Sequence, residues 1–259
     1  MSKREPCQVT VKSAERLTTN MQRLVLSGES LSRFPASCES GYIKLLFMPD
    51  GAPVTDTICL KSLSGKPVMR TYTIRQFNAE TLEMTVDFVL HGHDGHSGPA
   101  ANWAEHCKAG DTICIAGPGD IKLINQDAQW LLFAGDMTAL PAISCNLEQL
   151  PANTRGVVII DILDDSDRQS LIAPEGIEVI WVKGRDEFLS TIHNQSWSDT
   201  NVSVWCACEF SVMREARQFF KVENNIPREK LYISSYWKQG IAEEEHKVVK
   251  QQDAEKDKG

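Results

Sequence analysis

The sequence has no C-x-x-C pair, although it contains eight cysteines. Iron–sulfur clusters and zinc sites usually take their thiolate ligands from closely grouped cysteines, so this scattered spacing argues against either centre. Cys114 and Cys206 lie in the apolar runs TICIAG and VSVWCAC. We expect both to be reduced thiols that fill the core.

Long apolar runs are also missing. No stretch approaches the roughly 18 apolar residues that a membrane-spanning helix needs. The N-terminal MSKREPCQVT has no apolar run after its charges, as a secretory signal would. These absences predict a cytoplasmic protein that is not associated with a membrane.

Basic residues are outnumbered, since 27 Lys and Arg against 35 Asp and Glu give a net charge of -8. A nucleic-acid partner is therefore not expected, because it would require a basic face to neutralise phosphates. A local basic pocket remains compatible with this charge.

Short β patterns fill residues 8–120. Six segments of strand length follow one another without long helices between them: QVTVKSAERL, MQRLVLSG, YIKLLFMP, TYTIRQF, LEMTVDFVL and DTICIAGP. They predict an N-terminal six-stranded antiparallel β-barrel. One helix, in GPAANWAEHCKAGD, is expected to interrupt the set and to end near Gly110.

After Gly119, apolar strands alternate with helical patterns, which predicts a parallel α/β domain with helices on both faces of its sheet. The polar KLINQDAQ marks the boundary. We therefore expect domains at residues 1–124 and 125–241. Residues 242–259 form a highly charged tail that could be a solvated helix, with its last residues frayed.

The segment RTYTIR is the first that indicates chemistry. On a strand, Arg70 and Tyr72 project to the same face because side chains repeat every two residues. Arginine suits a pyrophosphate, a tyrosine ring can pack on a flat ring, and the hydroxyl of Thr73 can bond a heteroatom. An amphipathic strand with two exposed arginines is the alternative.

The second segment, residues 86–111, runs from a strand through a glycine-rich loop into a helix. Free N–H groups and the helix dipole make such a helix start suitable for phosphate. Gly98, Ala100 and Ala101 would let the backbone approach a ligand. His91, His93 and His96 could ligate zinc or iron, but no cysteine or carboxylate pattern supports this, and we expect no metal site.

Two further segments belong to the second domain. WLLFAGDMTALPAISCNL is its first strand–turn–helix, and ligands of such sheets bind at the carboxyl ends of strands. LYISSYWKQG ends its last strand with Tyr236 and Trp237, which could belong to the core or stack on a cofactor ring.

Together these segments resemble the siderophore-interacting protein family, which comprises FAD-dependent ferric-siderophore reductases with a ferredoxin-reductase-like layout. The resemblance rests on RTYTIR, on DFVLHG followed by GPAANWA, on GDMTALPA and on YWKQG, in that order. One departure is Ala207-Cys208-Glu209, where the family often has Ala-Gly-Glu.

The resemblance implies a set of FAD-binding residues, to which we add Trp237. On the barrel strand they are Arg70, Thr71, Tyr72 and Thr73; near the flavin or its ribityl chain, Asp87, Val89 and His91; around the pyrophosphate, Gly98, Ala100, Ala101 and Trp103; and from the second domain, Asp136, Thr138 and Ala139.

The implied reaction is reduction of Fe(III) to Fe(II) in a ferric siderophore, which frees the metal. It needs no acid–base residue at the iron, so no catalytic residue is named. Lys44 and Lys238 are our candidates for binding an anionic siderophore, and ordinary surface lysines are the alternative.

Either NADH or NADPH is the expected electron donor. Asp161, Asp164 and Asp165 favour NADH because they would repel a 2′-phosphate, although Arg168 lies close by. Ferredoxin is the other candidate donor. The protein is expected to act as a monomer.

Two other functions are compatible with the sequence. One is a general NAD(P)H flavin or ferredoxin-type reductase without a siderophore role. The other is a siderophore-binding protein without turnover, which would lack the yellow colour of a flavin.

Overall fold

The computed structural model describes residues 5–62, 65–90, 98–196 and 201–256. The chain forms two compact units, Met1–Ile121 and Lys122–Gly259. Among the described residues, no helix combines the length and the apolar character that crossing a membrane requires.

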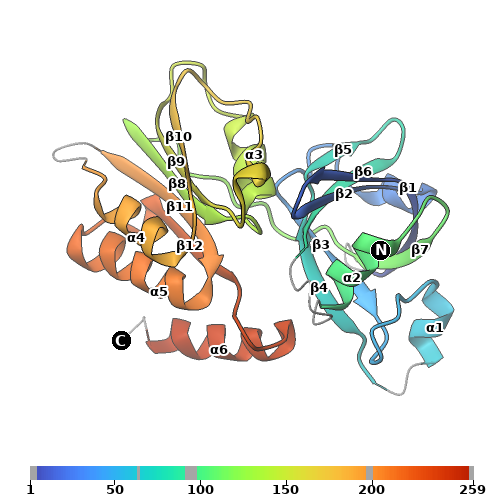
Figure 1. Ribbon diagram of the computed structural model, residues 1–259. Helices are drawn as coiled ribbons and strands as arrows, with labels where there is room; N and C mark the ends of the chain where they lie inside the picture. Colours follow the sequence, from blue (N-terminus) through green and yellow to red (C-terminus); the bar gives the residue numbers. More distant parts are fainter. Residues whose placement is uncertain (1–4, 63–64, 91–97, 197–200, 257–259) are drawn as a thin grey trace. The chain divides into compact units, whose positions relative to one another are not determined.

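The first unit is a curled antiparallel sheet (Figure 1). Its strands are β1 (Cys7–Thr18), β2 (Met21–Ser27), β3 (Tyr42–Phe47), β4 (Val68–Thr73), β5 (Gln76–Asn78), β6 (Glu83–Val89) and β7 (Thr112–Ala116), joined by a 3-10 turn (Glu29–Arg33) and helices α1 (Thr57–Ser62) and α2 (Pro99–His106). The strand order is β4-β3-β7-β1-β2-β6-β5.

The sheet has seven strands where six were predicted, because TYTIRQF is shared between β4 and β5. Between them, the Ile74 N–H donates to Gly41 O at 2.8 Å and the Arg75 N–H to Thr85 O at 2.9 Å. The backbone thus changes partners from the β3 side of the sheet to the β6 side. Since β4 and β5 are the two edges of the order and follow each other in the chain, the sheet curls round on itself like a barrel.

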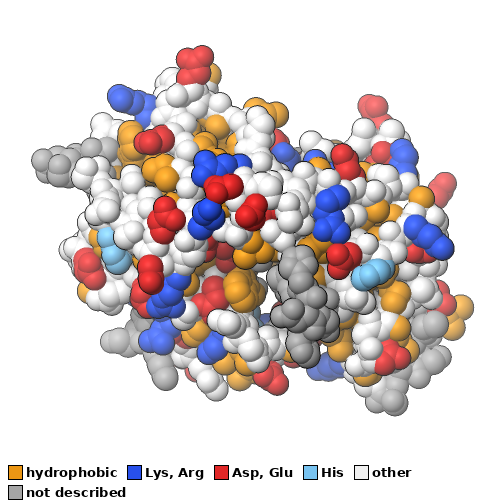
Figure 2. All heavy atoms as spheres, in the orientation of Figure 1, with side chains coloured by type: hydrophobic (Ala, Val, Ile, Leu, Met, Phe, Trp, Pro, Cys, Tyr) orange, Lys and Arg blue, Asp and Glu red, His pale blue; other side chains and the backbone are white. Residues whose placement is uncertain are grey.

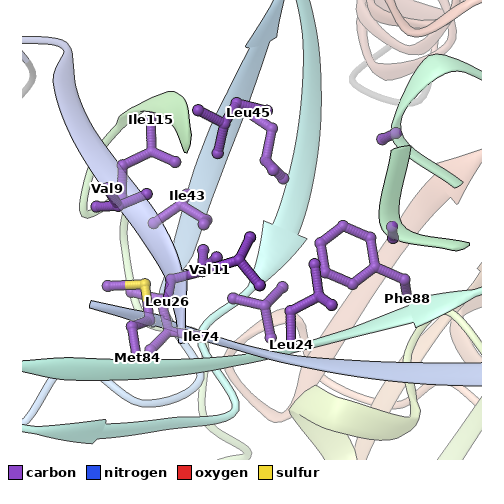
Figure 3. Close-up of a cluster of buried hydrophobic side chains, with 14 of the residues drawn as sticks. Val9, Val11, Leu24, Leu26, Ile43, Leu45, Ile74, Met84, Phe88 and Ile115 are labelled. Carbon is purple, nitrogen blue, oxygen red and sulfur yellow. The ribbon is translucent and has the colours of Figure 1, made fainter. Parts of the chain in front are cut away.

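Aliphatic side chains fill the interior of this sheet. Val9 and Val11, Leu24 and Leu26, and Ile43 come from β1, β2 and β3 and are at most 1% exposed (Figure 3). Each contributes about 1.5–3 kcal/mol by leaving water. In β1 and β3 they alternate with polar residues, and in β2 with the less buried Val25, which is the period of two that predicted the strands.

The α2 helix ends at His106, so the predicted end near Gly110 is wrong. Cys107 is extended, with its N–H on Trp103 O, and Gly110 has a φ of 95°. The Gly110 N–H instead donates to Val11 O of β1 at 2.9 Å.

The second unit is a five-stranded parallel sheet in the order β10-β9-β8-β11-β12. Its strands are β8 (Trp130–Asp136), β9 (Arg155–Asp161), β10 (Gly176–Val182), β11 (Val202–Glu209) and β12 (Leu231–Trp237). Its helices are α3 (Leu140–Leu147), α4 (Arg185–His193), α5 (Phe210–Arg217) with a π-helical turn at Gln218–Glu223, and α6 (Glu243–Lys256); 3-10 turns lie at Asp165–Asp167 and Arg228–Lys230.

Helices cover both faces of this sheet, α3 on one and α4 with α5 on the other (Figure 1). The central strands are therefore apolar throughout, as the continuous runs in the sequence predicted. The chain builds outward from β8 to β10 and then returns to β11 on the opposite side of β8. The carboxyl ends of β8 and β11 thus form the topological switch point, where open α/β sheets bind their ligands.

The charged tail forms the α6 helix, which ionisable groups attach to the second unit. His246 is buried, with Nε2 at 2.8 Å from Ser235 Oγ, and Lys250 Nζ donates to Ser234 Oγ at 2.7 Å. Asp253 pairs with Arg217 at 2.7 Å. These contacts hold the helix as far as Asp253, where the sequence predicted a frayed end.

Candidate functional site

Strand β4 presents two different faces. Arg70 and Tyr72 pair with the buried Leu45 and Ile43 of β3, so they share the inner face of the sheet. Thr71 pairs with Lys44 and points the other way. The predicted common face of Arg70 and Tyr72 is thus present.

Three aromatic rings connect β4, β6 and α2, and we call them the aromatic row: Tyr72, Phe88 and Trp103. The Tyr72 and Phe88 centroids are 4.3 Å apart, and those of Phe88 and Trp103 are 6.3 Å apart in an edge-on arrangement. Phe88 is fully buried between its two neighbours. The strand with RTYTIR and the helix of GPAANWA are therefore joined through one side chain, which neither segment contains.

The row and two alanines attach α2 to the barrel core. Ala100 and Ala101 are 2% and 3% exposed, and Trp103 is 8% exposed. The helix starts at Gly98 with Pro99 in its first turn, and no side chain caps it among the described residues. Among the described residues, a Cβ added to Gly98 would meet no atom within 4 Å. The first N–H groups of a helix, here including those of Ala100 and Ala101, have no partner inside the helix.

Asp87 has a partner that the sequence reasoning missed. Its carboxylate accepts two hydrogen bonds at 2.7 Å from Arg23 of β2, Nε to Oδ1 and Nη2 to Oδ2, and its side chain is 4% exposed. Such a bidentate pair holds β2 to β6. Val89 ends β6 and is half-buried, whereas His91, His93 and His96 lie outside the described residues.

The carboxyl end of β8 has an acid that three partners hold in place. Asp136 Oδ1 accepts from the Thr138 N–H at 2.9 Å and the Thr138 hydroxyl at 2.5 Å, and Oδ2 accepts from Trp237 Nε1 at 2.7 Å. Burial raises the pKa of Asp136, while hydrogen bonds from Thr138, Trp237 and the Glu209 backbone act in the opposite direction. Asp136, Thr138 and Trp237, taken from two separate motifs, are therefore in contact.

Ala139 acts as a spacer beside this acid. It is fully buried, and a Cβ added to Gly135 would lie 2.8 Å from the Ala139 Cβ and 2.9 Å from Ala207 O. Position 135 therefore has no room for a side chain unless Ala139 or Ala207 shifts. Trp237, by contrast, is 41% exposed, so its indole is not a core residue.

A second acid, Glu209, ends β11. Its Oε2 accepts from the N–H groups of Ser211 at 2.5 Å and Val212 at 3.2 Å, and its Oε1 accepts from the Gln239 N–H at 3.2 Å. Burial alone would raise the pKa of Glu209, but these hydrogen bonds outweigh it and the pKa is lowered. Sequence reasoning singled out the missing glycine at Cys208 and gave Glu209 no role.

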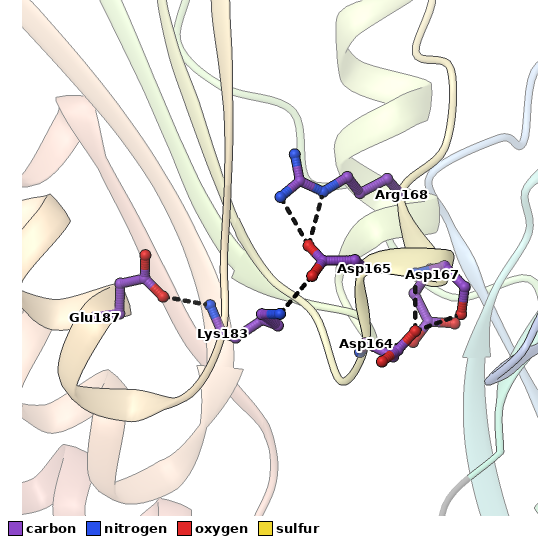
Figure 4. A network of polar contacts seen from close by, with 7 residues as sticks. Asp164, Asp165, Asp167, Arg168, Lys183 and Glu187 are labelled. Carbon is purple, nitrogen blue, oxygen red and sulfur yellow. Dashed lines mark hydrogen bonds and ion pairs between the residues drawn. The ribbon is translucent and has the colours of Figure 1, made fainter.

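The loop after β9 carries acids and cations together (Figure 4). Asp165 accepts from Arg168 at 2.8 Å and from Lys183 at 2.5 Å. Asp164 caps the 3-10 turn at Asp165–Asp167. Of the three predicted acids Asp161, Asp164 and Asp165, it is Asp165 that pairs with both cations.

Asp161 ends β9 and accepts from the Gly184 N–H at 2.7 Å. Burial, with smaller effects of the carboxylates of Asp136 and Glu187, raises its pKa to about 6, and the Gly184 hydrogen bond opposes this rise.

The two lysine candidates have different surroundings. Lys44 Nζ donates to Thr71 Oγ1 at 2.8 Å and lies over the Tyr42 ring, on the face of β3 opposite to that of Arg70 and Tyr72. Lys238 Nζ lies 4.7 Å from the centroid of the Phe210 ring. It borders an open hollow of about 500 Å³ that is also lined by Phe210, Ser211, Arg214, Glu215 and Gln218.

A curled antiparallel sheet followed by a parallel sheet with its switch point at β8 and β11 resembles the ferredoxin-reductase-like fold. The chain belongs to the siderophore-interacting protein family. Residues 10–121 match the siderophore-interacting FAD-binding domain, and residues 128–240 match the siderophore-interacting protein domain.

Named relatives extend over nearly the whole chain. It is 29% identical to the ferric vibriobactin reductase ViuB of Vibrio cholerae, over 88% of both proteins. It is 24% identical to the NADPH-dependent ferric-chelate reductase of Escherichia coli, over 89% of this chain and 92% of that protein. The crystal structure of the siderophore-interacting protein SipS from Aeromonas hydrophila superposes with a TM-score of 0.85 at 28% identity, covering 97% of this chain and 99% of that one.

The aromatic row generates a test of the flavin site. We expect Phe88→Leu to lower FAD affinity roughly tenfold, because Tyr72 loses the ring against which it packs, which corresponds to about 1.4 kcal/mol. Fluorescence titration with FAD measures this. Phe77→Leu is the matched control, because Phe77 is buried in the same core but pairs with Phe34. Equal FAD affinity in the two variants would refute a role for the row.

Proposed function

We propose that this protein is an FAD-dependent reductase that converts Fe(III) in ferric siderophores to Fe(II) and so frees the metal. The observation that carries the proposal is the aromatic row, which joins the Arg70 strand to the open start of α2 inside a domain matched as FAD-binding. The ferric-reductase names of relatives that align over almost the whole chain support the choice of substrate.

The residues of the first unit fit FAD. The open start of α2 would bind the pyrophosphate through the N–H groups of Ala100 and Ala101, and Arg70 would add a guanidinium to it. Tyr72 would pack on the flavin ring, and Thr73 would bond it. Gly98 leaves room for a phosphate, while Trp103 supports the helix from within.

Further cofactor residues are proposed from the resemblance. They are Thr71, Asp87, Val89 and His91 in the first unit, and Asp136, Thr138, Ala139 and Trp237 in the second. The exposed indole of Trp237, held by Asp136, is suited to ring stacking. The role of Asp87 would be indirect, because Arg23 occupies its carboxylate.

FAD held by these residues would supply the conversion of a hydride's electron pair into single electrons. Siderophores hold Fe(III) through hard oxygen donors, which hold Fe(II) much less firmly, so one electron releases the iron. The protein's own residues need only bind the two partners and orient them. No side chain is assigned a proton transfer at the iron.

Binding of an anionic siderophore needs local cations. On the face drawn in Figure 2, basic side chains are interspersed with acidic ones. An anionic siderophore at this face would therefore be attracted by individual residues and not by a broad basic patch. We propose Lys44 and Lys238 for this role. The hollow beside Lys238 supports the second assignment, whereas Lys44 lies on the opposite face of its sheet from Arg70.

We propose a cytoplasmic monomer, with ferredoxin as an alternative donor to NAD(P)H. The location is supported by the cysteines whose side chains the structure describes, which are buried thiols outside any disulfide. A reducing compartment would keep them so.

Arg70 provides the test of the flavin site and of turnover together. A charge-assisted contact with a phosphate contributes about 1.5–3 kcal/mol, so Arg70→Ala should weaken FAD binding roughly ten- to a hundredfold. Ferric-siderophore reduction should fall in parallel and recover when FAD is added in excess. Arg33→Ala, at a surface turn of the same unit, is the control. Full FAD occupancy in Arg70→Ala would refute the assignment.

For the donor we propose NADH, because Asp165 would repel a 2′-phosphate at the end of β9. Arg168 and Lys183, now paired with Asp165, would be available to that phosphate if the carboxylate were removed. Asp165→Asn should therefore raise kcat/KM for NADPH several-fold and leave that for NADH unchanged, measured by stopped-flow flavin reduction. Glu175→Gln, just before the amino end of β10 and so at the opposite end of the parallel strands from Asp165, is the control. Wild-type preference for NADPH would contradict the choice of NADH.

A further inference from the structure

Three sequence motifs of the second unit meet at the carboxyl ends of adjacent strands. GDMTALPA contributes Asp136 from β8, Ala207-Cys208-Glu209 ends β11, and YWKQG follows from β12. Both acids accept hydrogen bonds from the last of these, which we call the 237–239 segment. The segment is therefore attached at its first and its third residue.

The first attachment reaches across a strand. In the sheet, β11 lies between β8 and β12, so the bond from Trp237 to Asp136 passes over the carboxyl end of β11. The second attachment comes from β11 itself, since Glu209 Oε1 accepts from the Gln239 N–H. The two anchors hold the chain on either side of Lys238, one through the Trp237 indole and the other through the Gln239 backbone.

Both carboxylate oxygens of Glu209 already accept hydrogen bonds. Its Oε2 already caps α5 through the N–H groups of Ser211 and Val212, and its Oε1 holds Gln239. One carboxylate thus couples the start of α5 to the 237–239 segment. Phe210, the first residue of α5, is also the ring beneath the ammonium of Lys238.

These contacts restrict the positions that the Lys238 ammonium can occupy. A lysine has a long flexible stem, and holding its ammonium at one place costs side-chain entropy. Here the backbone is anchored on both sides and the ammonium lies on Phe210 at the border of the hollow. Glu209 contributes to both constraints, because it accepts from the Gln239 N–H on one side and caps the helix that begins at Phe210.

We propose that Glu209 is a positioning residue that holds Lys238 at the hollow for an anionic ferric chelate. This rests on the proposed role of Lys238 in siderophore binding. Glu209 itself touches neither chelate nor flavin in this proposal. It acts through the 237–239 segment and through the start of α5.

Glu209→Gln is the informative substitution. An amide has one acceptor oxygen, and the helix cap engages it with two N–H groups and the Ser211 hydroxyl, which leaves the NH₂ group against the Gln239 N–H. The cap should survive while the 237–239 segment loses its anchor. Glu187→Gln is the matched control, because Glu187 likewise accepts a backbone N–H, that of Lys183, at the start of α4.

The measurement is calorimetric binding of redox-inert probes to the oxidised, FAD-loaded protein. Gallium(III) tris-catecholate serves as the anionic chelate and neutral gallium(III) tris-acetohydroxamate as its counterpart. We expect Glu209→Gln to raise Kd for the anionic probe roughly five- to tenfold, as Lys238→Met does, and to leave the neutral probe unchanged. The double variant should be no worse than Lys238→Met alone.

Full additivity of the two substitutions would overturn the proposal, as would an unchanged Kd in Glu209→Gln or an equal loss in Glu187→Gln. If the substitutions weakened the binding of NADH and left that of the anionic probe unchanged, Lys238 would belong to the donor site. That result would also overturn the proposal. Because gallium is not reduced, the outcome is independent of turnover. A wild type that binds the anionic probe with this coupling but reduces no ferric chelate would contradict the proposed function alone.

Discussion

The packing of Phe88 between Tyr72 and Trp103 is the contact on which the first unit's site depends. Arg70 and Tyr72 are on β4, and α2 begins some twenty-five residues after that strand ends, beyond β5 and β6. Nothing in either segment alone fixes their separation. A buried ring that touches both sets it, because close-packed interiors permit few alternative arrangements of large side chains. In the proposed site, a barrel strand and a helix start thereby become the two sides that bind phosphate and flavin.

In the second unit, carboxylates and not an aromatic ring hold separate elements together. Asp136 and Glu209 end neighbouring strands at the switch point, and each collects hydrogen bonds from more than one element. A net charge of -8 would by itself oppose anionic partners. Acids that accept internal hydrogen bonds or form ion pairs, such as that of Asp165 with Lys183, repel an anionic partner less. A single cation can then attract that partner locally. Substrate selection by one positioned lysine is consistent with that arrangement.

Much of this organisation was predictable, and what was not has identifiable physical causes. Strand periodicity predicted both sheets and the common face of Arg70 and Tyr72. It could not divide TYTIRQF into two strands, because the division is set by which backbone partners Ile74 and Arg75 find. Motif spacing indicated Asp87 but not Arg23, since their pairing joins residues 64 apart. Glu209 escaped notice for the same reason, because its bond to Gln239 exists only once β11 and β12 are paired.

The central claim is that electrons pass from NAD(P)H through FAD to siderophore-bound iron, and an anaerobic titration tests it most directly. The flavin is first reduced with one equivalent of NADH and then mixed with a ferric siderophore in the presence of a ferrous-iron trap. Because a hydride carries two electrons, the account predicts flavin reoxidation with about two Fe(II) trapped per FAD. A reduced flavin that persists beside the ferric siderophore, or that reoxidises without trapped Fe(II), would contradict it.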